Sequence, residues 1–289
     1  MKNNDPLISV LMTSYNREKY IAKSIESIFA STYTNWELII LDDFSKDRTF
    51  EIALEYSVKD SRIKAYRNKV NLGQFRNRNE IVKYSKGEYL KYLDSDDLLY
   101  PYGLEQLVYY MEQFPEAGYG LCSIKQDDQL IYPYQLTPEQ SYKAHYLQGR
   151  GIFNKAPLSS IFRRKAFTDI CGFPHEAVSG DFAMWNHIAC YYPVVLMPEG
   201  IVWYRAHEEQ EMQKTRDNYL VEFEYLKVAE YYLKSNYCPL SEYDRLTCLK
   251  NNYKQQKKFI ISKTLRNGFF AGFNLIEHYN TEAKINSAF

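Results

Sequence analysis

Three carboxylates occur within four residues, at Asp94, Asp96 and Asp97. The apolar run 89–93 precedes them and Pro101 follows, so the pattern predicts a turn at the end of a strand. Carboxylates this close repel one another, and a bound divalent cation relieves the repulsion because Mg²⁺ and Mn²⁺ prefer oxygen ligands. Such a cation keeps coordination positions for substrate phosphates. The alternative interpretation is a solvated acidic turn, which is common in proteins.

Two earlier segments also predict strands that end in polar residues. Residues 7–12 and 36–41 are nearly continuous apolar runs, typical of strands buried on both faces of a parallel sheet. The residues that follow them are Thr13, Ser14 and Tyr15 in the first case and Asp42 and Asp43 in the second. A helical pattern follows each strand, which indicates β-α units with right-handed crossovers. Ligands bind beyond the carboxyl ends of such strands, so we expect all three polar segments to meet at one edge.

Smaller features complete the expected elements. Asn16 is predicted to cap the first helix, and Gly87 to close a helix over residues 76–84. Residues 126–148 are expected to form a strand or loop excursion over one face. Residues 157–162 are expected to form a strand.

The sequence predicts two regions. Residues 1–211 should form an α/β domain with a mostly parallel sheet flanked by helices. Residues 212–289 should form an α-helical extension, because apolar stripes recur there at helical spacing. The helices expected in this extension cover residues 219–234, 242–263 and 264–279.

Composition narrows the class of protein. The 289 residues carry 36 basic and 36 acidic side chains, so the excess of basic side chains typical of nucleic-acid-binding proteins is missing. Five cysteines form no C-x-x-C pair, which favours a reducing compartment. No apolar run approaches the ~18 residues of a membrane span, and the N-terminus has no signal-peptide pattern. We therefore expect a cytoplasmic protein, with peripheral contact at the inner face of a membrane left open.

The ordered motifs of residues 6–210 resemble the inverting glycosyltransferases of family 2, which have the GT-A fold. The motifs that carry the resemblance are Thr13-Ser14-Tyr15-Asn16, Leu41-Asp42-Asp43, Asn71-Leu72-Gly73, Arg78-Asn79, Gly87-Glu88-Tyr89-Leu90, Leu93-Asp94-Ser95-Asp96-Asp97, Gly172-Phe173, Gly180-Asp181 and Tyr204-Arg205-Ala206-His207. One of these motifs alone is weak evidence, whereas the ordered set is strong.

The resemblance implies which residues bind a nucleotide sugar. It assigns Tyr15 to the base and Asp42 to the imide N–H of uracil, where a carboxylate makes a strong charge-assisted bond. Arg78 would face the base or the diphosphate, and Asp94 the ribose or a metal-bound water. The alternatives are a helix-entry role for Tyr15, a turn role for Asp42 and simple pairing of Arg78 with a nearby aspartate. The remaining residues assigned to the nucleotide sugar are Thr13, Ser14, Ser95 and Asp96.

The resemblance also implies a cation and a catalytic base. Asp96 would hold Mn²⁺ or Mg²⁺, while Asp97 would substitute for a neighbour or fix the turn. His207 would close the nucleotide site as a second metal ligand or as a diphosphate contact, and the alternative for it is a structural role. Asp181, at a predicted helix N-terminus, would deprotonate the acceptor hydroxyl. The family usually has Glu-Asp where this chain has Gly180-Asp181, which puts the substrate in doubt. The alternative for Asp181 is a plain helix cap.

Together these features predict a metal-dependent enzyme that transfers one sugar from a nucleoside diphosphate, with UDP favoured, to an acceptor hydroxyl in surface-glycan synthesis. The acceptor would be a glycan or a lipid-linked molecule. The C-terminal helices would bind a membrane surface or a second copy of the chain. The rival predictions are a sugar-1-phosphate nucleotidyltransferase and a non-catalytic binding protein on the same scaffold. The sequence has no Gly-x-Gly-x-x-Gly or P-loop motif, which argues against dinucleotide-binding enzymes and P-loop NTPases.

Overall fold

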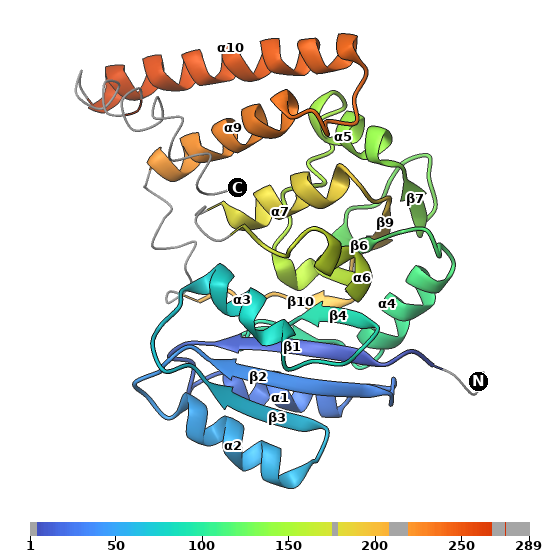
Figure 1. The fold of residues 1–289 in the computed structure, drawn as a ribbon, viewed down its shortest axis with the longest axis vertical. Coiled ribbons are helices and arrows are strands. Elements are labelled where there is room, and N and C mark those ends of the chain that lie inside the picture. Colours follow the sequence, from blue (N-terminus) through green and yellow to red (C-terminus); the bar gives the residue numbers. More distant parts are fainter. Residues whose placement is uncertain (1–4, 175–178, 208–218, 268–274, 276–289) are drawn as a thin grey trace. The chain divides into compact units, whose positions relative to one another are not determined.

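The computed structural model describes residues 5–174, 179–207, 219–267 and 275 (Figure 1). The chain divides into two compact units, each built from several segments. The first unit comprises Met1–Thr137, Lys155–Phe173 and Tyr192–Arg205, and the second comprises Pro138–Asn154, Pro174–Tyr191 and Ala206–Phe289.

The first unit contains an eight-stranded sheet in the order β3-β2-β1-β4-β8-β6-β9-β7. Strands β3, β2, β1 and β4 are parallel, whereas β8 is antiparallel to both of its neighbours. The strands are β1 (Ile8–Ser14), β2 (Trp36–Asp42), β3 (Ile63–Arg67), β4 (Tyr89–Tyr92), β6 (Tyr119–Ile124), β7 (Tyr134–Leu136), β8 (Ser160–Arg163) and β9 (Val194–Pro198). The expected α/β class with a mostly parallel sheet is confirmed.

A two-stranded ribbon and several helices complete this unit. Strand β5 (Leu98–Leu99) pairs antiparallel with β10 (Val202–Trp203), so Leu98 and Leu99, just after the acidic turn, lie beside Trp203 and Val202, far later in the chain. The helices are α1 (Ile21–Phe29), α2 (Thr49–Lys59), α3 (Gln74–Val82), α4 (Gly103–Glu112) and α6 (Arg164–Asp169), with the short 3₁₀ helix η1 (Pro157–Ser159).

Buried apolar side chains explain the central strands. Strand β2 is buried along its whole length, and β1 is buried except at Thr13. Such strands need cover on both faces, which parallel sheets receive from their crossover helices. The close packing reaches the backbone at Gly87, where an added Cβ would lie 2.5 Å from the Ser9 nitrogen and 2.7 Å from the Leu7 oxygen.

One local expectation was wrong and two were only partly right. Helix α1 begins at Ile21, and the Asn16 side chain accepts a hydrogen bond from the Lys46 nitrogen at 2.8 Å instead of capping that helix. Residues 126–148 include strand β7 and helix α5 (Pro138–Tyr146). Residues 157–159 form η1, so the strand expected over 157–162 begins only at Ser160.

The second unit is helical among its described residues. It contains α5, α7 (Gly180–Ala189), α9 (Tyr219–Lys234) and α10 (Glu242–Asn267). The prediction for residues 219–234 is confirmed, but α10 continues through the expected break between residues 263 and 264. Most of the helix expected over 264–279, and the predicted domain boundary at residues 211 and 212, lie outside the described residues.

The polar side chain of Glu230 joins the two long helices of this unit. Glu230 in α9 accepts hydrogen bonds from Lys227 at 2.7 Å, Lys234 at 2.5 Å and Gln256 of α10 at 2.8 Å. Gln256 also donates to the Asn252 oxygen at 2.6 Å. Because both members of the inter-helix contact are buried, this network fixes how α9 packs on α10.

All five cysteines are unpaired, and Cys171 is the one classed as exposed. Within the described residues, no helix is long and apolar enough to cross a membrane.

Cys171 and Gly172 end helix α6 with positive φ angles, and the next residue, Phe173, exchanges hydrogen bonds with the Asn79 side chain of α3 at 2.7 and 2.8 Å.

Candidate functional site

The carboxyl ends of β2, β1 and β4 lie side by side. The register places Ser14 opposite Asp42 in the β1–β2 pair and Leu11 opposite Tyr92 in the β1–β4 pair. The Leu93 nitrogen then donates to the Leu11 oxygen at 3.0 Å, so the acidic turn leaves the sheet beside the end of β1. The prediction that three polar segments meet at one edge is confirmed.

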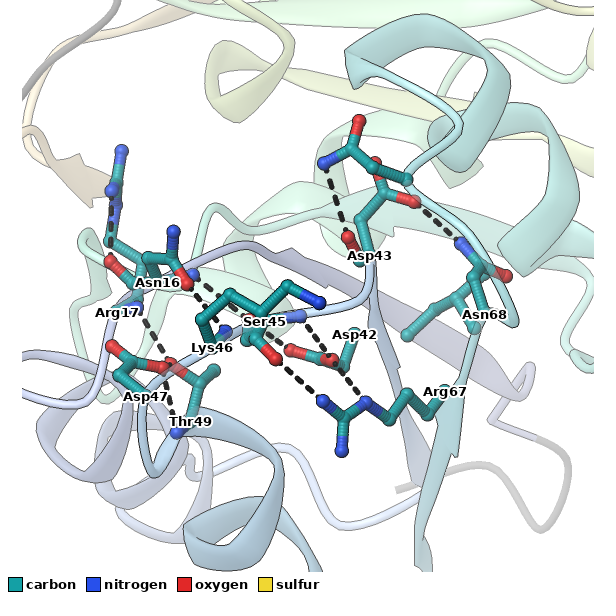
Figure 2. Close-up of polar contacts among 12 residues, drawn as sticks. Asn16, Arg17, Asp42, Asp43, Ser45, Lys46, Asp47, Thr49, Arg67 and Asn68 are labelled. Carbon is teal, nitrogen blue, oxygen red and sulfur yellow. Dashed lines mark hydrogen bonds and ion pairs between the residues drawn. The ribbon is translucent and has the colours of Figure 1, made fainter.

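Hydrogen bonds tie the loop after β1 to the loop after β2 (Figure 2). The Asn16 nitrogen donates to Ser45 Oγ at 2.9 Å, and the Arg17 nitrogen donates to Thr49 Oγ1 at 2.7 Å. Asn16 has a φ of 53°, in the left-handed region that costs most residues energy but asparagine less. The cost is offset because both the backbone and the side chain of Asn16 bind the neighbouring loop.

Asp42 is fully buried and organises the second loop. Its carboxylate accepts hydrogen bonds from the Ser45 nitrogen at 2.9 Å and from Ser45 Oγ, with Arg67 Nε at 3.4 Å. Burial raises the pKa of Asp42, which the bonds from Ser45 and the charge of Arg67 oppose. These contacts match the turn role that was the alternative interpretation, and a role toward a base stays a prediction.

Asp43 holds the turn at residues 71–73. Its Oδ1 accepts from the Leu72 nitrogen at 2.8 Å and from the Asn68 side chain at 2.8 Å, and its Oδ2 accepts from the Gly73 nitrogen at 2.9 Å. The bond to Asn68 is visible in Figure 2. Asp43 is therefore a turn residue that sets the start of α3.

Asp94 and Asp96 have different arginine partners. Arg78 Nη2 lies 2.6 Å from Asp94 Oδ1, and the Arg78 side chain is only 3% exposed. Arg17 Nε lies 2.8 Å from Asp96 Oδ2, and the Arg17 side chain is 19% exposed. Arg78 thus pairs with a nearby aspartate, the alternative interpretation of its role. Its buried Nε and Nη1 have no hydrogen-bond partner within the described part of the chain.

Asp97 fixes the turn from inside. It is buried, and burial together with the charges of Asp94 and Asp96 raises the pKa of Asp97 to about 8. Its Oδ1 accepts from the Arg205 nitrogen at 2.8 Å, and Arg205 Nε donates to the Asp96 backbone oxygen at 2.7 Å. The segment after β10 therefore clamps the acidic turn, which explains why Tyr204-Arg205 belongs to the motif set.

A buried lysine lies beneath the acidic turn. Lys91 of β4 is fully buried and donates to the Leu158 backbone oxygen. Burial lowers the pKa of Lys91 to about 8, while Cys122, Asp94 and Asp97 raise it. A lysine that keeps its charge there opposes the repulsion among the carboxylates.

The rim of the site carries exposed aromatic rings. Tyr15 follows β1 and is 45% exposed, while Trp203 and Tyr204 are 39% and 47% exposed. Burial raises the pKa of Tyr204, and Asp97, Asp96 and Asp94 raise it further, which indicates that this ring lies close to the turn. Aromatic rings beside carboxylates suit a ligand with a flat or apolar face and a cationic or hydroxylated part.

The serines predicted to bind a ligand are both buried. Ser14 Oγ is buried without a hydrogen-bond partner among the described residues. The Ser95 side chain is buried as well, and its backbone oxygen accepts from Ser24 Oγ at 2.9 Å, so α1 supports the turn. Thr13, the last predicted residue of this edge, is half-buried at the end of β1.

The acidic turn suits a divalent cation held by few protein ligands. No group of three or more His, Cys, Asp or Glu side chains within the described ranges forms a complete metal cage. Asp94 and Asp96 supply hard oxygens on one turn, and Mg²⁺ and Mn²⁺ take one or two such carboxylates together with phosphates. At Asp96 the cationic guanidinium of Arg17 already occupies one carboxylate oxygen. The residues present therefore fit a cation that also binds a substrate phosphate.

Asp181 and His207 belong to the second unit. Asp181 lies in the first turn of α7, half-buried, and its Oδ1 accepts from the Phe182 nitrogen at 2.7 Å. The residue before the helix, Ser179, donates through its nitrogen and Oγ to Glu224 of α9 at 3.3 and 3.2 Å. His207 is half-buried. The roles of Asp181 and His207 stay predictions.

Sequence reasoning missed Arg17 and Lys91, and it did not assign Arg205 a role. Arg17 directly follows the predicted ligand-binding segment, and Lys91 is a charge inside an otherwise apolar strand, which was an available signal. The bond from Arg205 to the turn depends on β10 returning to β5, which no local pattern reveals.

Comparisons with known proteins agree with this fold. The model of the family Glycosyl transferase family 2 matches residues 9–171. A putative glycosyltransferase, EpsE of Bacillus subtilis, is 42% identical over 112 residues, which is 38% of this chain and 40% of EpsE. An uncharacterised glycosyltransferase of Methanocaldococcus jannaschii is 30% identical over 270 residues, which is 88% of this chain and 82% of that protein. The match thus spans less than half of EpsE.

Solved structures share the fold at low identity. TarS of S. aureus in complex with UDP-GlcNAc has a TM-score of 0.67 at 19% identity, covering 97% of this chain and 79% of TarS. The mannosyltransferase PcManGT of Pyrobaculum calidifontis, in complex with GDP-Man and Mn²⁺, has a TM-score of 0.61 at 13% identity, covering 98% and 83%. The family match covers more than half of the chain, and the matched residues include the three segments that meet at the edge of the sheet. The chain is a glycosyltransferase and belongs to glycosyl transferase family 2.

Proposed function

We propose that this enzyme transfers a single sugar, with inversion, from a nucleoside diphosphate sugar to an acceptor hydroxyl. UDP is the favoured nucleotide. One observation carries the proposal: three loops meet at the carboxyl edge of the sheet, where the middle loop, after β1, carries the exposed ring of Tyr15 and the loops after β2 and β4, on either side of it, carry aspartates. A nucleotide sugar likewise combines a flat base, which can stack on a ring, with a ribose and a diphosphate that bind polar groups and a cation.

The donor would lie along this edge. The ring of Tyr15 would stack on the base, with Thr13 and the Ser14 hydroxyl beside it, and Asp42 would face the uracil imide. The Ser14 hydroxyl has no hydrogen-bond partner among the described residues. Asp94 would contact the ribose, and Ser95 would shape the turn. Arg78 would act by fixing Asp94, because its guanidinium is buried against that carboxylate. Arg78 therefore supports the nucleotide site without being accessible itself.

The cation proposed for this site is Mn²⁺ or Mg²⁺, held by Asp96 and His207. When bound, it neutralises the charge that develops on the departing nucleoside diphosphate. The structure of PcManGT, whose fold this chain shares, was solved with GDP-Man and Mn²⁺, and this supports the proposal of a metal at the corresponding edge.

Asp181 would act as the catalytic base. A carboxylate in the first turn of a helix is held in a fixed orientation, here by the Phe182 nitrogen. It would take the proton of the acceptor hydroxyl as that oxygen attacks the sugar from the face opposite the leaving group. Inversion follows from this single displacement.

The setting we propose is surface-polysaccharide or glycoconjugate synthesis, with a glycan or a lipid-linked molecule as the acceptor. WfgD of Escherichia coli, a UDP-Glc:alpha-D-GlcNAc-diphosphoundecaprenol beta-1,3-glucosyltransferase, is 45% identical over 95 residues, which is 33% of this chain and 37% of WfgD. The matched part lacks much of WfgD, so the sugar and the acceptor are not carried over with it.

A thermal-shift panel of UDP-, GDP- and dTDP-sugars, with and without Mn²⁺, tests the donor and the metal. We expect UDP-sugars to raise the melting temperature most, since a ligand that binds the native state stabilises it by mass action. Asp96→Ala should lose the part of the shift that requires Mn²⁺. Retention of the full shift in that variant would show that Asp96 does not hold the metal.

Product analysis tests the reaction. Turnover with an accepted donor should release free UDP and a product of inverted anomeric configuration, and Asp181→Asn should lower kcat by at least a hundredfold. Release of pyrophosphate, or retention of configuration, would overturn the proposed reaction.

A further inference from the structure

We propose that Arg17 is an exchangeable counter-ion of Asp96: it holds this carboxylate in the metal-free enzyme and gives it up to the cation when a donor binds. This inference rests on the proposed function, because it requires Asp96 to be the metal-binding carboxylate. It adds a role for a residue that sequence reasoning did not assign.

The geometry singles out Asp96 among the three aspartates. Asp97 is buried and bound to the Arg205 backbone. Asp94 is paired with Arg78, a buried residue of α3 whose side chain is 3% exposed. Asp96 is paired with Arg17, whose side chain is 19% exposed. A partner that water can reach is replaced at lower cost than a buried one, so Asp96 is the carboxylate that can change partners.

The Arg17 side chain has other hydrogen-bond acceptors close by. Its Nη1 donates to the backbone oxygens of Tyr15 at 3.3 Å and Asn16 at 3.1 Å, which keeps the guanidinium over the loop after β1. Its Nη2 has no hydrogen-bond partner among the residues that the structure describes. The Arg17 backbone is anchored separately by Thr49, so the side chain can move without the loop.

Charge makes the exchange favourable only when both ligands are present. A divalent cation at Asp96 repels the guanidinium, so without nucleotide the two compete for one carboxylate. A diphosphate brings negative charge beside the cation and offers the planar guanidinium two oxygens. Arg17 would therefore weaken the binding of metal alone and strengthen the binding of the metal–nucleotide pair.

Direct binding measurements on the enzyme test this inference. The affinity for Mn²⁺ alone is measured from the electron paramagnetic resonance signal of the free ion, and the affinity for UDP at saturating Mn²⁺ by calorimetry. For Arg17→Gln we expect Mn²⁺ alone to bind about tenfold more tightly and UDP about tenfold more weakly, the change expected from one charge-assisted hydrogen bond in each case.

The two affinities of Arg17→Gln are expected to change in opposite directions, and this distinguishes an exchange of partners from a purely structural role of Arg17. A structural role would weaken both affinities, and either that result or an unchanged Mn²⁺ affinity would overturn the inference. Arg48→Gln is the matched control: it removes the same charge from the neighbouring loop, where the Arg48 side chain is 72% exposed, and should leave both affinities unchanged. Arg17→Lys keeps the positive charge but loses the planar guanidinium that can donate two parallel hydrogen bonds. Both affinities of this variant should lie between those of wild type and Arg17→Gln.

Asp96→Asn separates this inference from the proposed function. If that variant binds Mn²⁺ as wild type does, the proposed metal site is wrong and the exchange falls with it. If Asp96→Asn loses Mn²⁺ while Arg17→Gln shows no gain, the metal site stands and only the exchange is overturned.

Discussion

The aspartates of the acidic turn show how position decides the behaviour of identical side chains. Asp97 is inside the protein, where burial and the charges of Asp94 and Asp96 raise its pKa to about 8, whereas Asp94 and Asp96 each pair with an arginine. A protonated Asp97 removes one of three adjacent negative charges. The turn therefore tolerates three aspartates partly because the innermost one need not be ionised at neutral pH.

At the same scale, Tyr15 should contribute to nucleotide affinity through its exposed ring. Tyr15→Ala is expected to weaken UDP binding by about 1 kcal/mol, roughly fivefold, because it removes the stacking surface. Tyr15→Phe should bind like the wild type, since stacking needs the ring and not the hydroxyl. Calorimetric titration with UDP measures the effect.

The control for Tyr15 is Tyr109, an exposed tyrosine of α4. Tyr109→Ala should leave the affinity for UDP unchanged. Equal affinities for Tyr15→Ala and wild type would remove Tyr15 from the nucleotide site.

At the scale of elements, Gly87 sets how closely β4 approaches β1. A Cβ at this position would meet the backbone of Ser9 at 2.5 Å and of Leu7 at 2.7 Å, and strands cannot move apart without losing their ladder. Gly87→Ala should lower the free energy of unfolding by about 2 kcal/mol or more. Urea denaturation measures the change.

Lys86→Ala is the control for Gly87→Ala, because the neighbouring Lys86 side chain is exposed. Its effect should stay within about 0.5 kcal/mol. A neutral Gly87→Ala variant would show that the contact between β4 and β1 is looser than the structure indicates.

The packing of α9 on α10 should depend on pH through Glu230. Burial alone would raise the pKa of Glu230, but hydrogen bonds from Lys227, Lys234 and Gln256 lower it from 4.5 to about 2. A carboxyl group whose pKa is lower in the folded than in the unfolded state stabilises the folded protein at pH values above its unfolded pKa. The contribution of Glu230 to the free energy of unfolding is therefore complete above about pH 4.5 and is lost as the pH falls toward 2. After allowance for solvent screening it amounts to about 2 kcal/mol.

Glu230→Gln should therefore be less stable than wild type at pH 7, and the difference should shrink between pH 4.5 and 2. Glu222→Gln is the matched control, because Glu222 also pairs with a lysine of α10, Lys263 at 3.0 Å, but is 49% exposed. Its effect should be below 1 kcal/mol. Parallel losses of stability with pH in wild type and Glu230→Gln would contradict the role of this network.

At the scale of the whole molecule, the second unit is assembled from segments far apart in the chain. Helix α9 packs on α7 through the ring contact of Phe182 with Tyr225 and the bond from Ser179 to Glu224. A chain that ends at Arg205 keeps α5 and α7 but loses α9, so their buried apolar faces would meet water. We expect this truncation to be insoluble or to bind a hydrophobic dye, whereas a compact, soluble product would show that α9 is dispensable.

The fold was more predictable from sequence than the contacts of the site. Continuous apolar runs predict β1 and β2, and their order along the chain predicts a shared edge for Thr13, Asp42 and Asp96. The sequence left two alternatives for the contacts of Asp42 and two for those of Arg78, because these contacts depend on residues from other elements of the fold. Asn16 shows the same limit: its amide looks like a helix cap but binds Lys46, a residue of the next loop.

The single exposed thiol, Cys171, offers a practical route to watching this enzyme at work. It lies two residues before Phe173, whose backbone is bonded to Asn79, the immediate neighbour of Arg78. A fluorophore attached to Cys171 would thus lie outside the edge of the sheet where the donor is proposed to bind. Through the hydrogen bonds of Phe173 with Asn79 it would still be linked to α3, the helix that carries Arg78. Its emission would test, without a label on the sugar, whether donor binding changes the surroundings of α3.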